Sequence, residues 1–330
     1  MAMAAGKQVS VAPMMDVTDR HCRYFLRQIS PHVRLYTEMI TAQAVLHCDR
    51  ERLLGFDPAE HPLALQLGGH DPLQLAAAAR IAAARGYDEI NLNVGCPSDR
   101  VRDGRFGACL MLEAEQVARC VGAMAEAVTV PVTVKTRIGV DDHDSYEFLA
   151  AFVDRVARAG CGTFIVHARK AILQGLSPRE NREVPPLQPE RVHRLKREFP
   201  ALRIIINGGI DSIERIDAEL ALLDGVMLGR KVAGDPCFLA AVEARFLAGT
   251  DERPALDRGH VVRRMSEYAQ RQADSGVRLH HVTRHMLGLY HGQPGARGWR
   301  RFLCEQAGRP GARPQLLLDS LAAIGGRNGA

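Results

Sequence analysis

The amino-acid sequence predicts an α/β protein that folds as a (β/α)8 barrel, the TIM-barrel class, followed by a small C-terminal helical domain. Eight short β-rich runs recur at fairly even intervals, and helical patterns alternate with them over about 230 residues. The G-x-G-x-x-G motif of an open doubly wound sheet is missing after the first run. We therefore expect a barrel domain over residues 1–248 and a helical domain over residues 249–330.

The predicted strands are mostly continuous apolar stretches, as in Ile204–Ile206, rather than alternating ones. This pattern is typical of strands that are covered on both faces of a parallel sheet. In chain order the runs are Val9–Met15, Arg34–Met39, Leu63–Leu67, Glu89–Val94, Pro131–Thr136, Thr163–His167, Arg203–Asn207 and Gly225–Leu228.

The predicted helices carry Ala-rich or amphipathic patterns between the strands. Those of the barrel are Thr41–Leu54, Pro72–Arg85, Glu113–Ala127, Ser145–Ala159, Pro189–Arg197 and Ser212–Leu222. After about Phe246 the alternation stops, and a polar segment, Gly249–Gly259, leads into helical patterns without convincing strands. These lie near His260–Gln272, Leu279–His291, Arg297–Glu305 and Gln315–Ile324.

The positive charge of the chain is concentrated at its end. The formal net charge is +5, but Arg258–Ala330 holds twelve Arg, no Lys and four acidic residues, which gives this segment +8 and leaves −3 for the rest. Clustered cations release counterions from phosphate, so the asymmetry favours a polyanionic partner. The alternative is that Arg-rich helices only form a solvated surface.

The composition, with 46% hydrophobic and 25% charged residues, excludes disordered, collagen-like and low-complexity classes. Eight cysteines without a CxxC pair predict a reduced, cytoplasmic protein. Met1–Gln8 has no long apolar region and no apolar run approaches about 18 residues, so we expect neither secretion nor membrane spanning. His281 and His285 are four residues apart but lack a third ligand, so no metal is predicted, and nothing demands more than a monomer.

Functional residues of such barrels lie at the carboxyl ends of the strands and in the loops that follow. The residues singled out at these positions are Pro13, Met14, Met15, Gln66, Asn93, Cys96, Lys135, Arg137, His167, Arg169, Asn207, Gly208, Gly209, Gly229 and Arg230. Glycines after the seventh and eighth strands, with Arg230, predict a phosphate site, because backbone N–H groups there can approach an anion closely. The alternative is that these glycines only form tight turns.

Lys135 and His167 end apolar strands, where burial without a partner would cost about 2–7 kcal/mol. This indicates a ligand. Lys135 could be a Schiff-base nucleophile or a cation facing an electron-rich ring. The alternative is an internal ion pair of Lys135 with Asp88 or Glu89.

Cys96 lies between Gly95 and Pro97, just beyond a strand end, and is followed by a charged loop that contains glycine. A thiol at the base of such a loop can act as an acid, exposed when the loop opens and sealed when it closes. The other cysteines lie mostly in apolar contexts, as Cys120 and Cys161 do, and we expect them to fill the core.

Taken in order, these residues resemble the tRNA-dihydrouridine synthases. The resemblance covers the whole predicted barrel, and Asn-x-Gly-Cys-Pro combined with Asn-Gly-Gly is highly specific. Its segments are Val11–Met14, Leu65–Leu67, Leu92–Ser98, Lys135–Gly139, His167–Arg169, Ile206–Ile210 and Met227–Arg230. Gly175–Arg182 and Pro294–Arg301 resemble the A-type branch, which modifies uridines 20 and 20a of the tRNA D-loop, although Ile172 and Arg179 depart from its usual aromatic residue and lysine.

The resemblance implies an FMN enzyme that uses NADPH and reduces the C5–C6 bond of uridine in tRNA. Hydride would pass from reduced FMN to C6, and Cys96 would donate the proton to C5. The residues that it places on FMN are Pro13, Met14, Met15, Gln66, Lys135, His167, Asn207, Gly208, Gly209, Gly229 and Arg230. Those that it places on tRNA are Asn93, Arg179, Arg182, Arg297 and Arg300.

Three other classes stay open on the residues alone. A flavin barrel that reduces a small pyrimidine lacks a use for the basic tail. A Lys135 aldolase would be colourless and trappable by borohydride. An RNA-binding protein without enzymatic activity leaves the polar strand ends unexplained.

Overall fold

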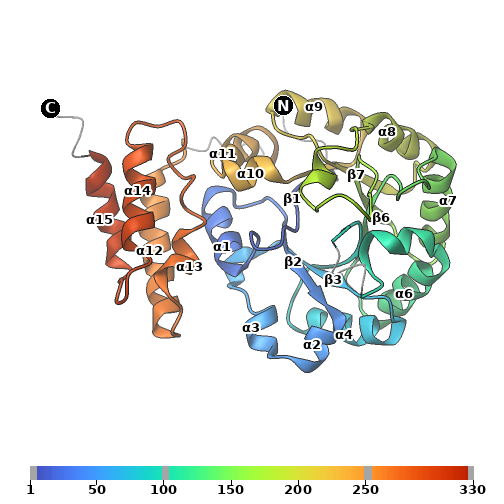
Figure 1. Cartoon of the computed structure of the whole chain (residues 1–330), viewed down its shortest axis with the longest axis horizontal. Coiled ribbons are helices and arrows are strands. Elements are labelled where there is room, and N and C mark those ends of the chain that lie inside the picture. The colour runs from blue at the N-terminus through green and yellow to red at the C-terminus, as the bar shows by residue number, and fades with distance from the viewer. Residues whose placement is uncertain (1–5, 99–103, 249–254, 326–330) are drawn as a thin grey trace. The chain divides into compact units, whose positions relative to one another are not determined.

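Eight parallel strands form one sheet whose order, β1-β8-β7-β6-β5-β4-β3-β2, follows the chain around a barrel (Figure 1). This computed structural model describes residues 6–98, 104–248 and 255–325. The strands are β1 (Gln8–Val11), β2 (Leu35–Thr41), β3 (Leu63–Gly68), β4 (Glu89–Val94), β5 (Val132–Arg137), β6 (Thr163–His167), β7 (Arg203–Asn207) and β8 (Gly225–Leu228). The predicted TIM-barrel class is therefore confirmed.

The barrel closes between its first two strands. Ser10 of β1 forms a parallel bridge with Arg34, which directly precedes β2. The amide of Val11 donates to the carbonyl of Arg34 at 2.9 Å, and the amide of Arg34 donates to the carbonyl of Val9 at 3.2 Å. These bonds pair the edges that an open sheet would leave exposed.

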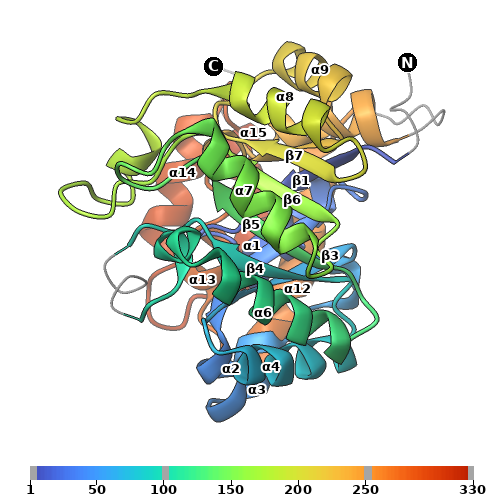
Figure 2. The same cartoon turned by 90° about the vertical axis from the view of Figure 1, so that its right-hand side faces the viewer.

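Helices cover the outside of the strands. Figures 1 and 2 show α6, α7 and α8 following one another around the barrel. The helices are α2 (Ala42–His47), α3 (Arg50–Leu54), α4 (Pro72–Ala84), α6 (Ala114–Ala127), α7 (Tyr146–Ala157), α8 (Pro189–Glu198) and α9 (Ile213–Leu222), with short helices η1 (Pro58–Glu60), η2 (Gly107–Leu112) and η3 (Glu180–Arg182). Side-chain caps set several of their starts: Asp71 accepts from the amide of Gln74, and Ser145 from that of Phe148.

Near the N-terminus one prediction is wrong and one helix was not predicted. The first strand ends at Val11 and not at Met15, because Pro13 has no amide hydrogen to continue the ladder. Helix α1 (Arg20–Ile29) was not predicted. Its apolar residues are interspersed with Arg and His, which hid a helix that starts at the Asp19 cap.

The C-terminal region is helical, as expected. Its helices are α10 (Arg230–Gly234), α11 (Phe238–Val242), the π-helix η4 (Glu243–Leu247), α12 (Arg258–Asp274), α13 (Leu279–Thr283), α14 (Ala296–Gln306) and α15 (Gln315–Gly325). The predicted helix Leu279–His291 ends at Thr283. Beyond it lie turns that contain Gly288, where a Cβ would meet Pro236 at 2.8 Å, and Gly292 at a φ of +70°.

By proximity of Cα atoms the chain divides into two units. The barrel unit consists of the described residues of Ala4–Asp16 and Arg34–Gly229, and the helical unit of those of Val17–Val33 and Arg230–Ala330. Helices α1, α10 and α11 therefore group with the C-terminal helices. The functional boundary between residues 248 and 249 stays a prediction.

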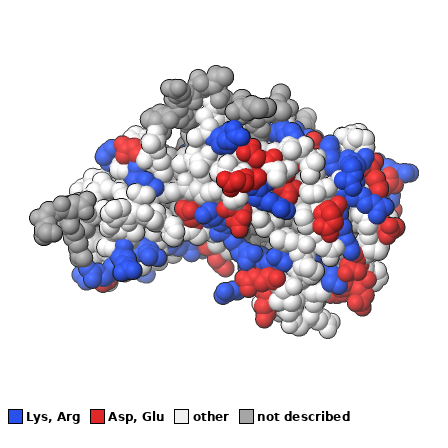
Figure 3. Space-filling model, turned by 90° about the horizontal axis from the view of Figure 1, so that it is seen from above, with Lys and Arg blue, Asp and Glu red and all other residues white. Residues whose placement is uncertain are grey.

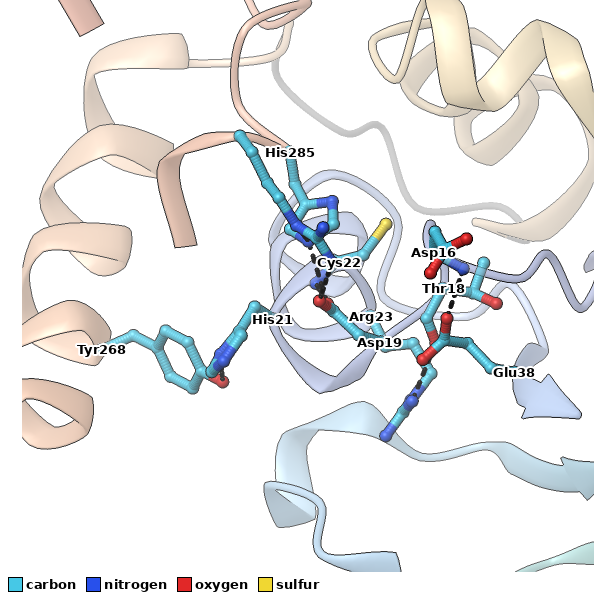
Figure 4. Close-up of polar contacts among 10 residues, drawn as sticks. Asp16, Thr18, Asp19, His21, Cys22, Arg23, Glu38, Tyr268 and His285 are labelled. Carbon is cyan, nitrogen blue, oxygen red and sulfur yellow. Dashed lines mark hydrogen bonds and ion pairs between the residues drawn. The ribbon is translucent and has the colours of Figure 1, made fainter. Parts of the chain in front are cut away.

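The helical unit has its own aromatic core. Tyr24 of α1 stacks on Tyr268 of α12 with ring centroids 4.0 Å apart, and Tyr268 Oη lies 2.8 Å from Nδ1 of His21 (Figure 4). Trp299 of α14 is fully buried, and its Nε1 donates to the carbonyl of Met286 at 2.9 Å. Since buried aromatic side chains with satisfied polar atoms stabilise a core, this unit is well packed.

Candidate active site

The inside of the barrel changes from apolar to polar toward the carboxyl ends of the strands. An apolar layer fills its middle, formed by Ala12, Tyr36, Ala64, Ile165, Ile205 and Met227. Two residues later on their strands come Gln66, His167 and Asn207, which face the same interior because side chains alternate along a strand. The sequence-predicted residues of β3, β6 and β7 therefore meet at one end of the barrel.

Strand register brings the remaining polar residues to the same end. Asn93 of β4 is paired with Lys135 of β5, and His167 of β6 with Asn207 of β7. Asn207 is fixed there because its Nδ2 donates to the carbonyl of Met227 at 2.8 Å. We call the set Gln66, Asn93, Lys135, His167 and Asn207 the polar ring.

Lys135 is the cation of the polar ring. Its pKa is lowered from 10.5 to about 7, first by burial and then by the neighbouring charge of Arg137, whereas a charge on Cys96 acts in the opposite direction. No described residue forms a hydrogen bond or an ion pair with its Nζ. A partly buried cation without a protein partner indicates a position that suits a ligand.

The predicted alternative, an ion pair of Lys135 with Asp88 or Glu89, is wrong. Asp88 accepts from the amide of Leu63 at 2.6 Å and lies 2.7 Å from Nδ1 of His61. Glu89 accepts from Tyr36 at 2.6 Å and also pairs with Arg34. Both carboxylates belong to the start of β4 or just precede it, whereas Lys135 lies near the end of β5, so strand geometry keeps them apart.

His167 is buried with only 8% of its surface exposed, and its Nδ1 has no hydrogen-bond partner. Burial lowers the pKa of His167 well below 6.5, and the charges of Arg137, Lys135, Arg169 and Arg182 act in the same direction. The imidazole of His167 is therefore neutral at pH 7, and a ligand could form a hydrogen bond with its unpaired Nδ1.

The Gly208–Gly209 turn follows β7. Both residues have positive φ, +100° and +70°. A Cβ on Gly208 would lie 3.1 Å from Nε2 of His167, and one on Gly209 would lie 2.5 Å from Leu187. A side chain at either position would be strained, so this turn requires glycine. At Gly229 a Cβ would have only Ala12 nearby, at 4.0 Å, which leaves that backbone open to a ligand, and Arg230 follows in the chain.

Cys96 lies in a turn that hydrogen bonds define on both sides. The Oδ1 atom of Asn93 accepts from the amides of Gly95 and Cys96, each at 3.0 Å. The carbonyl of Cys96 accepts from the amide of Ala108 at 2.9 Å, and its Sγ lies 3.5 Å from Oγ of Ser98. The thiol is half-buried, so it can exchange protons with solvent.

Arg137, at the end of β5, connects the segment after β4 with two points of the segment after β6. Its guanidinium donates to the carbonyls of Gly95 at 3.1 Å, Lys170 at 3.2 Å and Asn181 at 2.9 Å. Asn181 in turn closes the 172–181 segment by exchanging hydrogen bonds with the backbone of Ile172 at 2.7 and 2.9 Å. Arg179 and Arg182, which lie on this segment, are exposed, and Arg179 pairs with Glu183 at 3.6 Å.

Met14 packs against the apolar layer, and half of the Met15 surface is exposed.

In the helical unit, Arg297 and Arg300 lie exposed on α14. On the face that Figure 3 shows, positive and negative side chains intermingle over most of the surface. Within the described part of the chain, however, no ion pair involves Arg297 or Arg300.

The buried polar residues that support the polar ring were not predicted from the sequence. Asn91 and Thr133 lie two positions before Asn93 and Lys135 on their strands and face the same interior. Both are hydrogen-bonded to each other at 2.8 Å. The signal was present as Asn91-Leu92-Asn93, an alternation of polar and apolar residues in a strand that is otherwise apolar.

Among the described residues no three His, Cys, Asp or Glu side chains are grouped as metal ligands, and no helix there is long and apolar enough to cross a bilayer. The absence of metal stays a prediction.

Fold and site together define a (β/α)8 barrel protein with a cluster of polar residues at the carboxyl ends of its strands. A model of the dihydrouridine synthase (Dus) family matches residues 10–322, almost the whole chain. The chain therefore belongs to the dihydrouridine synthase family.

Curated relatives carry the name tRNA-dihydrouridine(20/20a) synthase. One from Shewanella oneidensis is 57% identical over 303 residues, which cover 92% of this chain and 90% of that protein. Proteins from Xanthomonas campestris pv. campestris and Escherichia coli (strain K12) are 57% and 56% identical over 316 residues, or 96% of this chain and 93% and 91% of theirs. A solved 2-naphthoyl-CoA reductase complex is similar in fold alone, with a TM-score of 0.57, 11% identity and coverage of 72% of this chain and 50% of that one.

Proposed function

We propose that this protein reduces uridine to 5,6-dihydrouridine at positions 20 and 20a of the tRNA D-loop, with FMN as bound cofactor and NADPH as reductant. Its family and the names of its relatives support the reaction. The single observation that carries the chemistry is the polar ring with Cys96 at its edge, because it combines unpartnered donors with a proton source. In this proposal the protein acts in the cytoplasm as a monomer.

The residues of the ring fit a flavin. Nζ of Lys135 lacks a partner among the described residues, and Nδ1 of His167 is buried and unpaired. Two such groups suit the carbonyl oxygens and ring nitrogens of a planar, electron-rich heterocycle. Gln66, Asn207 and residues 13–15 would contact the flavin ring system. The FMN phosphate would be bound by Gly208, Gly209, Gly229 and Arg230.

The chemistry that bound FMN would supply is hydride delivery to C6 of uridine, with NADPH restoring its reduced state. Cys96 supplies the matching proton at C5. Its half-buried thiol can give a proton to carbon in the closed site and regain one from solvent. Lys135 provides a positive charge beside the reacting centre, and an anionic neighbour raises its protonated fraction because its pKa of about 7 lies at neutrality.

Recognition of tRNA would combine two kinds of contact. Oδ1 of Asn93 accepts from two backbone amides, and its Nδ2 donates one hydrogen to Oε1 of Gln66 at 2.7 Å. The second Nδ2 hydrogen would therefore be available to the edge of an extruded uridine. Arg179, Arg182, Arg297 and Arg300 are exposed and would meet phosphate and 2′-OH groups.

The decisive experiment combines a visible spectrum with dihydrouridine mapping. Purified protein, NADPH and an unmodified tRNA transcript should give a flavin spectrum that bleaches with NADPH and dihydrouridine at positions 20 and 20a. A colourless protein that borohydride traps on Lys135 would instead support the aldolase. Rapid oxidation of the reduced protein by free uracil or orotate would support a small-molecule reductase.

A further inference from the structure

A continuous chain of hydrogen bonds crosses the inside of the barrel through strands β3, β4 and β5. It leads from the turn that holds Cys96 down to the start of β4. Its members, in order, are Cys96, Asn93, Gln66, Asn91, Thr133 and Glu89. Apart from Cys96, every member is buried with at most 8% of its surface exposed.

We call this chain of hydrogen bonds the relay. Its half nearer Cys96 lies at the polar ring. The amide of Cys96 donates to Oδ1 of Asn93 at 3.0 Å. Nδ2 of Asn93 then donates to Oε1 of Gln66 at 2.7 Å. Each amide therefore accepts from the residue nearer Cys96 and donates to the one further away.

The lower half continues in the same direction. Nε2 of Gln66 donates to Oδ1 of Asn91 at 2.7 Å, and Nδ2 of Asn91 donates to Oγ1 of Thr133 at 2.8 Å. The Thr133 hydroxyl donates to Oε1 of Glu89 at 2.7 Å. The same oxygen accepts from Tyr36 at 2.6 Å, and the other carboxylate oxygen lies 3.4 Å from a guanidinium nitrogen of Arg34.

The two ends of the relay fix its direction. A backbone N–H can only donate, and an ionised carboxylate can only accept. Every amide between them must therefore direct its oxygen toward Cys96 and its nitrogen toward Glu89. Hydrogen bonds aligned in this way polarise one another in a medium of low dielectric constant, so the carboxylate strengthens the bond at the far end.

We propose that Thr133 and Asn91, anchored on Glu89, are positioning residues that act through Asn93 to hold the Cys96 turn. The inference rests on the proposed role of Cys96 as proton donor. A donor must be placed within hydrogen-bond reach of the carbon that it protonates, and a turn held by one amide oxygen is only as fixed as that oxygen. The relay gives Asn93 one orientation and so gives the turn one conformation.

Three variants test the relay in the purified full-length protein. Thr133→Val removes the hydroxyl that joins Asn91 to Glu89 and conserves the volume. Thr133→Ser keeps the hydroxyl. Tyr36→Phe is the matched control, because it removes a hydroxyl from the same Glu89 oxygen without cutting the relay.

The first readout is the amide proton of Cys96 in protein labelled with 15N-cysteine, which has eight cysteines to resolve. Without tRNA, Thr133→Val should shift the Cys96 signal upfield, since its hydrogen bond weakens, and leave the signals of the exposed Cys48 and Cys304 in place. Thr133→Ser should restore the signal, and Tyr36→Phe should leave it near its original position.

The second readout is the rate at which iodoacetamide alkylates Cys96, measured by peptide mass spectrometry with Cys48 and Cys304 as internal references. Thr133→Val should raise the relative rate about two- to tenfold, the range that corresponds to losing one hydrogen bond. An unchanged Cys96 signal and rate in folded Thr133→Val, or equal changes in Tyr36→Phe, would overturn the proposal.

If Thr133→Val does not fold, Glu89→Gln replaces it. A neutral amide oxygen is a weaker acceptor than a carboxylate, so the same upfield shift should appear with smaller amplitude, and its absence would refute the relay. Both readouts use protein without tRNA. Failure of the proposed acid role would instead appear as unchanged dihydrouridine formation by Cys96→Ala, so the two failures are distinguishable.

Discussion

The barrel end and helix α14 both carry positive charge, but they hold it in opposite ways. At the barrel end, Arg137 is buried and Lys135 partly so, and burial lowers the pKa of both. On α14, Arg297 and Arg300 extend into solvent. The first arrangement costs free energy unless a ligand or the backbone satisfies each group, whereas the second costs little.

This difference separates two kinds of function. Charge withdrawn from water acts strongly at short range and depends on pH, which suits chemistry on a bound molecule. Exposed charge is screened by salt and suits binding to a polyanion. The barrel end should therefore respond to pH and the basic helix to ionic strength, and four experiments test that division.

The largest effect is expected from Cys96→Ala. Removing a general acid lowers turnover by about 10²–10⁴-fold, while flavin content and tRNA affinity should stay as they are. Single-turnover formation of dihydrouridine measures the loss. Cys48→Ala is the control, because that thiol is also free but exposed. Normal turnover in Cys96→Ala would remove the thiol from the mechanism.

Lys135→Met tests the cost of the buried cation. Burial lowers the pKa of Lys135 to about 7, so between pH 7 and 10.5 the unfolded chain binds a proton that the folded chain does not. The free energy of unfolding of flavin-free protein should then rise with pH across that window, by at most about 1.4 kcal/mol per pH unit. Lys135→Met should lose this rise and, with it, flavin retention.

Denaturant titrations from pH 6 to 10 measure this slope. Lys231→Met serves as the control, because Lys231 of α10 pairs with Asp235 at 2.9 Å. The control should keep the pH dependence of the original protein. Equal slopes in Lys135→Met and the original protein would show that the Lys135 ammonium is hydrated in the folded state.

The double variant Arg297→Gln/Arg300→Gln tests the basic helix. Loss of two exposed cations should weaken tRNA binding about tenfold and reduce the salt dependence of log K by about 1–2 units, with no change in stability. Affinity titrations at several salt concentrations check both. Arg264→Gln is the matched control, since Arg264 pairs with Glu267 at 2.9 Å and should contribute less. Equal effects of Arg264→Gln on affinity and salt dependence would show that paired and unpaired arginines of this unit bind tRNA alike.

The sequence predicted much of the barrel because buried parallel strands are continuous apolar runs with polar residues at their ends. Ile204–Ile206 followed by Asn207-Gly208-Gly209 is such a case, and that strand has the predicted bounds. Helix α1 was not predicted because its cap, Asp19, and its Arg and His residues resemble a polar loop. The packing of Tyr24 on Tyr268, which shows the buried face of the helix, cannot be read from the sequence.

The residues of the candidate site were predictable from the sequence, but their hydrogen-bond partners were not. Lys135, His167 and Asn93 stand at strand ends in the sequence, so their meeting follows from barrel geometry alone. The partners of Glu89 depend on register between strands far apart in the chain, which is why the alternative that paired it with Lys135 was wrong and its contact with Thr133 was missed. The roles of the flavin- and tRNA-contacting residues stay predictions.

Asp19→Asn yields the smallest effect and asks whether every arginine of the basic segment serves binding. Asp19 caps α1, accepts from Arg284 at 2.6 Å and lies 2.9 Å from Nε2 of His285 (Figure 4). Burial alone would raise the pKa of Asp19, but His285, the Cys22 amide and Arg284 together lower it well below 3.8. Its stabilisation is therefore present above pH 3.8 and is lost as the pH falls below that value.

We expect Asp19→Asn to lower the free energy of unfolding by about 1–2 kcal/mol at pH 7 and to flatten its loss in acid, as seen in denaturant titrations at pH 3 and pH 7. Asp319→Asn, on the exposed face of α15, should do neither. tRNA affinity should stay the same in both variants, because Arg284 is engaged inside the helical unit and Arg297 and Arg300 are not. A fall in affinity with Asp19→Asn would mean that the ion pair also shapes the RNA-binding surface, and the separation between structural and binding arginines would then not hold.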